Sequence, residues 1–168
     1  MTSYPIEGPW QGELAIVPRP RGGDWLDDEI HALKDGHFDV LVSLLTRDES
    51  DEFDLAAEAD LSCAHGLQFC EFPITDLGIP QSLTAARVLI DKLYGGLRAG
   101  KKIAVHCRQG IGRSGLIAAS LLVASGVDAE TAFREVSDAR GLPVPETAEQ
   151  RQWVKGLARE CAASLVKG

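Results

Sequence analysis

The chain has 168 residues, with 17 basic and 25 acidic side chains and a formal net charge of −8. Its length suits one domain with a hydrophobic core, so we expect a single domain over residues 1–168. The acidic balance argues against general nucleic-acid binding and against attachment to anionic membranes, since both depend on basic residues. No apolar run approaches the roughly 20 residues of a membrane span, and the first residues lack an export signal. We therefore expect a cytoplasmic protein, acting as a monomer.

Apolar runs predict buried strands, and periodic segments between a capping residue and a glycine predict helices. After an irregular lead-in at residues 1–12, the predicted elements are a strand at 12–18, a helix at 25–35 capped by Asp24, a strand at 38–45, a helix at 51–65, a strand at 67–74, a helix at 83–99 capped by Ser82 or Thr84, a strand at 101–107, helices at 113–125 and 129–140, the second capped by Asp128, and a last helix from Thr147. Strands that alternate with helices predict an α/β fold, with a mainly parallel central sheet flanked by helices on both faces.

Helix 113–125 is apolar nearly all round, which predicts that it is the buried central helix. In parallel sheets of this kind, ligands bind outside the carboxyl ends of the strands. The segment that joins strand 101–107 to this helix is therefore the first place to look for a functional site.

That segment, residues 106–114, reads HCRQGIGRS. A glycine-bearing loop that enters a helix N-terminus turns backbone N–H groups towards an anion, and Gly110 and Gly112 permit the tight turns this needs. The same N–H groups favour the thiolate form of Cys107, which is the reactive form. Arg113 offers a planar fork that can bind two phosphate oxygens at once.

The residues predicted to bind a phosphoryl group are therefore Arg108, Gln109, Gly110, Ile111, Gly112 and Arg113. Ser114 can donate its hydroxyl to the sulfur of the leaving thiolate, and His106 is expected to support the loop by a hydrogen bond. Taken alone, Cys107 would be interpreted as a buried packing residue. Arg113 weighs against that interpretation, because a cation at a helix N-terminus is unfavourable unless an anion binds there.

The pattern His-Cys-x-x-Gly-x-x-Arg-Ser resembles the signature of the cysteine-based protein tyrosine and dual-specificity phosphatases. The similarity is strongest to the kinase-associated phosphatase group, which shares the Pro-Ile-x-Asp-x-Gly-x-Pro pattern of residues 73–80 and the Thr-Arg-x-Glu pattern of residues 46–49. The resemblance implies a protein-tyrosine-phosphatase-like fold, with Asp76 as the general acid. Rival acids that also follow a strand are Asp48, Asp51 and Asp54. Some relatives have a cysteine where this chain has Leu45, which leaves redox protection by that route in doubt.

The implied reaction passes through a phosphocysteine on Cys107 and needs no metal and no cofactor. The expected substrate is phosphotyrosine in a protein or peptide, with activity on phosphoserine and phosphothreonine left open. Gln150 has two readings: it could position the hydrolytic water, as a glutamine does in relatives, or it could only form a capping box with Thr147.

Three other functions remain open from the sequence. The same chemistry could act on an inositol phosphate or phosphoinositide, although the loop carries no lysine. The domain could bind phosphorylated ligands without turnover. A thiol redox enzyme would need a second cysteine near Cys107, and Cys70 is the nearest in sequence.

Overall fold

The computed structural model describes residues 1–167, with side chains described for residues 1–164, so position 168 of the predicted domain lies outside the described residues. Five strands form one sheet in the order β1-β2-β5-β3-β4. Their bounds are β1 Tyr4–Ile6, β2 Glu13–Ile16, β3 Val40–Ser43, β4 Gln68–Glu71 and β5 Lys102–His106. All neighbouring strands are parallel except β1, which pairs antiparallel with β2. The predicted mainly parallel sheet is confirmed.

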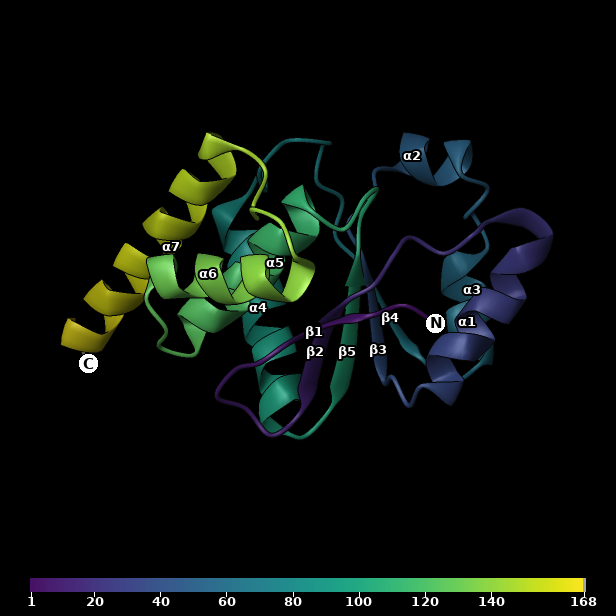
Figure 1. Cartoon of the computed structure of the whole chain (residues 1–168), viewed down its shortest axis with the longest axis horizontal. Helices are drawn as coiled ribbons and strands as arrows, with labels where there is room; N and C mark the ends of the chain where they lie inside the picture. The colour runs from purple at the N-terminus through teal and green to yellow at the C-terminus, as the bar shows by residue number, and fades with distance from the viewer. Residues whose placement is uncertain (168) are drawn as a thin grey trace.

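Helices cover both faces of the sheet, as predicted (Figure 1). Their bounds are α1 Leu26–Asp35, α2 Arg47–Glu52, α3 Glu58–Ala64, α4 Leu83–Arg98, α5 Gly112–Ala124, α6 Ala129–Arg140 and α7 Ala148–Lys167. Helices α1 and α3 pack on one face, while α4, α5 and α6 lie on the other with α7 against α5. Each face has its own cluster of buried apolar side chains.

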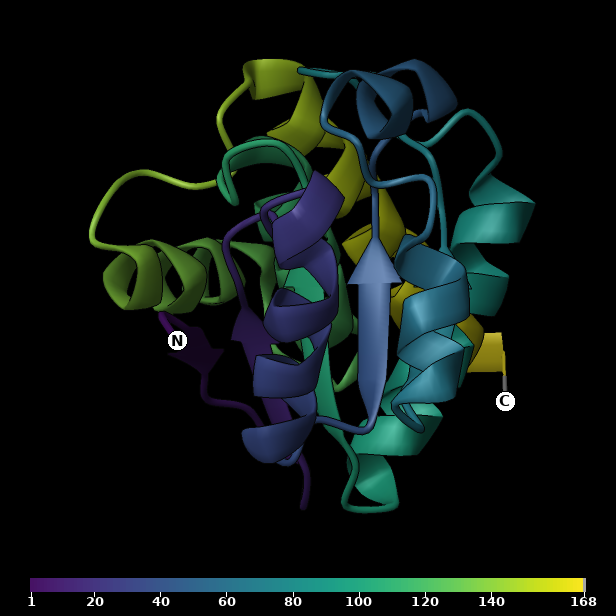
Figure 2. The ribbon, with the colours of Figure 1, turned by 90° about the vertical axis from the view of Figure 1, so that its right-hand side faces the viewer.

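Helix α5 occupies the centre of its layer. All its residues from Gly112 to Val123 are buried, and it contacts α4, α6 and α7. Strand β5 lies in the middle of the sheet between β2 and β3, so the loop from β5 to α5 emerges at the centre of the molecule. In Figure 2 the arrowhead of β3 points upward, and the segments that follow the parallel strands gather at that end.

Two predictions for the first 25 residues are wrong. Residues 1–12 are not wholly irregular, because β1 pairs with β2 through the register Tyr4↔Ile16 and Ile6↔Leu14. Asp24 does not cap the first long helix: it lies in a short 3₁₀ turn, Gly23–Trp25, and the cap position of α1 has no side-chain hydrogen bond. Edge pairing and the 3₁₀ turn both depend on neighbours that a local pattern does not reveal.

The single helix predicted at 51–65 is also wrong, because the segment forms two helices, α2 and α3. Helix α2 begins earlier, where Thr46 and Glu49 form a reciprocal capping box. The chain then breaks at Asp54, whose φ is +57°, and Leu55 turns into the apolar core. The energy of burying Leu55 outweighs the weak local helix propensity of this polar stretch.

The other predicted caps are confirmed. The hydroxyl of Ser82 accepts a hydrogen bond from the N–H of Ala85 at the start of α4, and Asp128 accepts one from Thr131 at the start of α6. Thr147 and Gln150 exchange reciprocal hydrogen bonds before α7. Within the described chain, no helix has the combined length and apolarity required for a membrane span.

The packing of α5 leads to a stability prediction. A Cβ at Gly115 would overlap a methyl group of Val144, whereas a Cβ at Gly95 of α4 would meet open space. We expect Gly115→Ala to lower the free energy of unfolding by about 1–3 kcal/mol through overpacking. The matched variant Gly95→Ala should raise it by roughly 0.5–1 kcal/mol, because alanine restricts the unfolded chain and favours a helix. Chemical denaturation gives the free energy of unfolding of both variants. The same change in both would contradict overpacking at Gly115.

Candidate active site

Cys107 directly follows β5 and lies at the start of the predicted phosphate loop. Its side chain is 2% exposed, and its Sγ accepts a hydrogen bond from the N–H of Gly110 at 3.3 Å. Gly110 has a φ of +69°, a value that glycine adopts without strain. The backbone N–H groups at positions 108, 109, 111, 112 and 113 have no acceptor among the described residues. The loop therefore presents a set of free donors around the sulfur.

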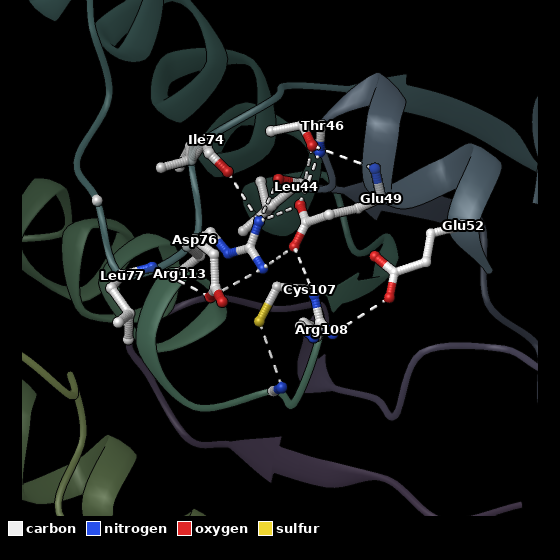
Figure 3. A network of polar contacts seen from close by, with 12 residues as sticks. Leu44, Thr46, Glu49, Glu52, Ile74, Asp76, Leu77, Cys107, Arg108 and Arg113 are labelled. Atoms are coloured by element: carbon white, nitrogen blue, oxygen red, sulfur yellow. Dashed lines mark hydrogen bonds and ion pairs between the residues drawn. The ribbon is translucent and has the colours of Figure 1, made fainter.

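Arg113, in the first turn of α5, is the largest fully buried side chain, with 1% exposed. Glu49 of α2 binds it through both carboxylate oxygens, at 2.7 Å to Nη1 and 2.8 Å to Nη2. Nη1 also donates to the carbonyl of Ile74 at 2.8 Å, and Nη2 contacts Oδ1 of Asp76 at 3.2 Å (Figure 3). Glu49 thus fixes the plane of the guanidinium group.

The pair is stable in its charged form. Burial alone would raise the pKa of Glu49, but hydrogen bonds from Arg113 and Thr46 outweigh it and hold this pKa below the ordinary glutamate range. Burial alone would lower the pKa of Arg113, but the hydrogen bond to Glu49 and the charges of Cys107, Glu49 and Asp76 hold this pKa above its ordinary value. The sequence identified Glu49 only as part of a shared pattern. Its Thr-x-x-Glu spacing marks the capping box and could have located α2.

Asp76 lies in the loop between β4 and α4, half exposed, and its Oδ1 accepts from the N–H of Leu77 at 3.1 Å. Leu77 has a φ of +62° and a largely exposed side chain. A cavity of about 230 Å³ contains Cys107 in its lining, and its complete lining is Asp76, Leu77, Cys107, Arg108, Gln109, Gly112, Arg113 and Glu146. The rival acids at positions 48, 51 and 54 do not line this cavity.

Glu146 is a cavity-lining carboxylate that the sequence did not single out. It precedes α7 and approaches Gly112, where a Cβ would lie 3.1 Å from Oε2 of Glu146. Gln150 is fully buried directly behind the cavity wall: its Nε2 would lie 3.0 Å from the same Cβ at Gly112, although its side chain is not part of the lining. Its Oε1 accepts from the N–H groups of Glu146 and Thr147, and its Nε2 donates to the carbonyl of Gly78 at 3.0 Å. Gln150 therefore joins the start of α7 to the loop that carries Asp76.

Arg140 supports the phosphate loop from outside, whereas His106 and Ser114 make no side-chain hydrogen bond to it among the described residues. Arg140, at the end of α6, donates from Nε to the carbonyl of Gly110 at 2.7 Å. His106 is buried, and its Nε2 is 2.7 Å from Oε1 of the buried Glu58, so its partner lies in α3 rather than in the loop. Ser114 is also buried, but its hydroxyl has no hydrogen-bond partner among the described residues, and no hydrogen bond to the sulfur is present.

Cys70, the cysteine nearest to Cys107 in sequence, lies too far away to pair with it. Cys70 is buried on β4, which is separated from β5 by β3, and the registers place Cys70 and Val105 opposite the same residue, Val42. Two strand spacings amount to about 10 Å, beyond the Cα separation that a disulfide spans. Among the described residues, no three His, Cys, Asp or Glu side chains are gathered as a metal site.

Comparison with known proteins identifies the family. A sequence profile described as "Polymorphic toxin system, DSP-PTPase phosphatase" matches residues 17–127, more than half of the chain and the whole segment from β3 to α5. The chain belongs to this phosphatase family.

Curated relatives agree with the assignment. Cyclin-dependent kinase inhibitor 3 of Sus scrofa is 30% identical over 129 residues, which cover 76% of this chain and 60% of the relative. A putative tyrosine phosphatase, 197R, of Invertebrate iridescent virus 6 is 37% identical over 87 residues, covering 49% and 31% of the two chains. The chain thus spans about 60% of the length of the kinase-inhibitor relatives.

Solved structures share the fold across nearly the whole chain. A kinase associated phosphatase superposes with a TM-score of 0.83 at 23% identity, covering 95% of this chain and 97% of the other. Tk-PTP in its active form superposes with a TM-score of 0.77 at 27% identity, covering 94% and 96%. The predicted protein-tyrosine-phosphatase-like fold is confirmed.

Proposed function

We propose that this chain hydrolyses phosphomonoesters as a single phosphatase domain, with phosphotyrosine in proteins or peptides as the preferred substrate class. The observation that carries the proposal is the buried guanidinium group of Arg113, which Glu49 fixes beside the cavity that contains Cys107. The family match and the names of the relatives support the same activity. No cofactor is needed, because the arginine and the loop N–H groups supply the positive charge.

In the first step, the Cys107 thiolate attacks phosphorus and the P–S bond forms as the bond to the leaving oxygen breaks. The hydrogens of Nη1 on Arg113 are taken by Glu49 and Ile74, and Glu49 also takes one hydrogen of Nη2, so Nε and the second Nη2 hydrogen are left to bind the phosphoryl oxygens. Asp76 now occupies one Nη2 donor, and a bound phosphoryl group would displace it. The displaced Asp76 then donates its proton to the leaving oxygen.

In the second step, water attacks the phosphocysteine. Asp76, now a carboxylate, accepts a proton from this water, the P–S bond breaks, and the Cys107 thiolate is restored with release of inorganic phosphate. Ser114 and the N–H of Gly110 would stabilise the departing thiolate. Gln150 acts at a distance in this scheme by holding the Asp76 loop through Gly78.

Asp76→Asn tests the proton donor. We expect kcat/KM, which reports only the first step, to fall roughly 10²- to 10⁴-fold with a phosphotyrosine peptide, because the leaving oxygen needs a proton. The loss should be much smaller with para-nitrophenyl phosphate, whose leaving group is stable as an anion. Asp51→Asn, which changes the same charge outside the cavity, is the matched control. Equal losses with both substrates, or an equal loss in the control, would argue against Asp76 as the acid.

The function itself is tested by hydrolysis of para-nitrophenyl phosphate in the presence of a metal chelator. A positive result should be followed by phosphotyrosine, phosphoserine and phosphothreonine peptides and by inositol phosphates at equal concentration. We expect the highest kcat/KM with phosphotyrosine peptides. Retained phosphopeptide binding with no turnover of any substrate would show a binding module instead.

A further inference from the structure

Two arginines contact the ring of Phe53, just outside the catalytic cavity. Phe53 follows α2, and its ring centroid is 3.7 Å from Cζ of Arg19 and 5.0 Å from Cζ of Arg108. Arg108 belongs to the phosphate loop and lines the cavity with Cys107. We call Arg19, Phe53 and Arg108 the arginine shelf. Its two like charges lie close together, although the chain as a whole is acidic.

Arg19 lacks a compensating anion of its own. Its one hydrogen bond within the described chain is a long one, 3.5 Å from Nη1 to the carbonyl of Pro20. Its Nε is buried with no partner, and no ion pair to it occurs among the described residues. Burial, and next the charge of Arg108, lower the pKa of Arg19, while Glu52 opposes them. Arg19 is partly buried as a whole, and its unpartnered Nε makes the site costly unless an anion meets the guanidinium group.

The neighbouring Arg21 shows the contrast. It also stacks on an aromatic ring, 4.4 Å from the centroid of Trp25, but Glu29 neutralises it with contacts of 2.8 Å from Nε and 2.7 Å from Nη2. Arg108 is intermediate, since it is 3.4 Å from Glu52 and 3.9 Å from Glu49 (Figure 3). The structure therefore leaves Arg19 as the cation of this segment with unused donors.

The sheet order brings Arg19 to the same end of the sheet as the catalytic cavity, which Arg108 lines, although Arg19 itself lines a separate cavity. Arg19 follows β2, and β2 pairs in parallel with β5 up to Ile16↔Val105. The segments that follow the two strands therefore leave the sheet at the same end. The N–H of Val17 extends this pairing with a bond of 3.0 Å to the carbonyl of Val105. A substrate whose phosphoryl group lies over Cys107 would thus place neighbouring groups within reach of Arg108 and Arg19.

We propose that the arginine shelf binds a second anionic group of the substrate, carried by a residue next to the phosphorylated one. This inference rests on the proposed function and adds a substrate class: phosphopeptides with an acidic or phosphorylated neighbour. A carboxylate and a phosphoryl group share the chemistry that the shelf recognises, namely an oxyanion that accepts from guanidinium N–H donors. Phe53 holds both guanidinium planes in place before the substrate arrives.

The test compares three phosphotyrosine peptides that differ at one neighbouring position, with glutamine, glutamate or phosphoserine. Release of phosphate from tyrosine is followed by mass spectrometry, and kcat/KM is measured for wild type, Arg19→Gln and Arg21→Gln. We expect wild type to favour the glutamate or phosphoserine peptide over the glutamine peptide by about fivefold, with the preference falling at high salt. Arg19→Gln should abolish it, whereas Arg21→Gln, with the same charge change, should retain it.

A preference for the phosphoserine peptide alone would support the shelf and identify a phosphoryl group as its ligand. An unchanged preference in Arg19→Gln, or an equal loss in Arg21→Gln, would overturn the proposal. So would a higher kcat/KM for an inositol polyphosphate than for any peptide. Arg19→Gln should keep the wild-type rate on para-nitrophenyl phosphate, because that substrate has no second anion.

Glu52→Gln provides a test in the opposite direction, which does not depend on the stability of the Arg19 variant. Glu52 competes with the substrate anion for Arg108, so its removal should increase the preference for the glutamate peptide about two- to threefold. A decreased or unchanged preference would count against the shelf. If wild type fails on para-nitrophenyl phosphate, the proposed function fails. The shelf is then still tested by the affinity of the three peptides for wild type and Arg19→Gln.

Discussion

Cys107→Ser should reduce kcat for para-nitrophenyl phosphate by roughly 10⁴-fold or more, because serine cannot form the phosphocysteine intermediate. A hydroxyl in place of the thiol stays protonated at neutral pH and is a far weaker nucleophile. The loop N–H groups and Arg113 are untouched by this change, so we expect the variant to bind phosphotyrosine peptides with an affinity close to the wild-type KM. Steady-state kinetics and calorimetric titration with the peptide test the two parts separately.

Cys63→Ser is the matched control. Cys63 is an exposed free cysteine in α3 and does not line the cavity. The kcat of Cys63→Ser should therefore remain within about twofold of wild type. Activity above a few per cent of wild type in Cys107→Ser would refute the phosphocysteine mechanism. If Cys107→Ser loses both peptide binding and turnover, the substitution disturbs the loop.

Glu49→Gln should have the second-largest effect, on both stability and catalysis. The amide leaves the buried guanidinium of Arg113 without its charge partner and directs an N–H₂ group towards one of the arginine nitrogens. Removal of one member of a buried ion pair costs about 3–5 kcal/mol. We expect a loss of this order in the free energy of unfolding, and a lower kcat/KM because Arg113 is no longer held in one plane.

The pH dependence of stability provides a second measurement on the same variant. The pKa of Glu49 is lowered in the folded state, so its carboxylate contributes stability above the unfolded pKa, roughly 4.3. This contribution is lost as the pH falls through the lower folded pKa. Wild type should therefore lose stability more steeply than Glu49→Gln as the pH falls below about 4.3.

Thr46→Ala is the control for the Glu49 substitution. It removes the hydroxyl that caps α2 but leaves the contacts between Glu49 and Arg113 in place. We expect a loss of about 1 kcal/mol, typical of a helix cap, and a nearly normal rate. Equal losses in the two variants would mean that Glu49 acts only through the capping box.

Much of the fold could be predicted from local sequence. The buried strands β3 and β5 and the helix α5 are signalled by nearly continuous apolar runs, and α6 and α4 by their caps. The failures share a cause. The segment at 51–65 has only a weak local preference for a continuous helix, and Leu55 packs into the core while Asp54 adopts a positive φ. Tertiary packing overrides a weak local preference there.

The chemistry proposed for the loop at 106–114 could be inferred from the sequence alone, because the thiol, the glycines and the arginine stand within one segment of nine residues. The contacts that hold these residues in place could not, because they come from other parts of the chain. Glu49 and Arg140 reach the loop from distant segments, Gln150 joins the Asp76 loop rather than lining the cavity, and Arg19 arrives beside Arg108. These partners depend on the order of strands in the sheet, and strand order is set by long-range packing that no local pattern encodes.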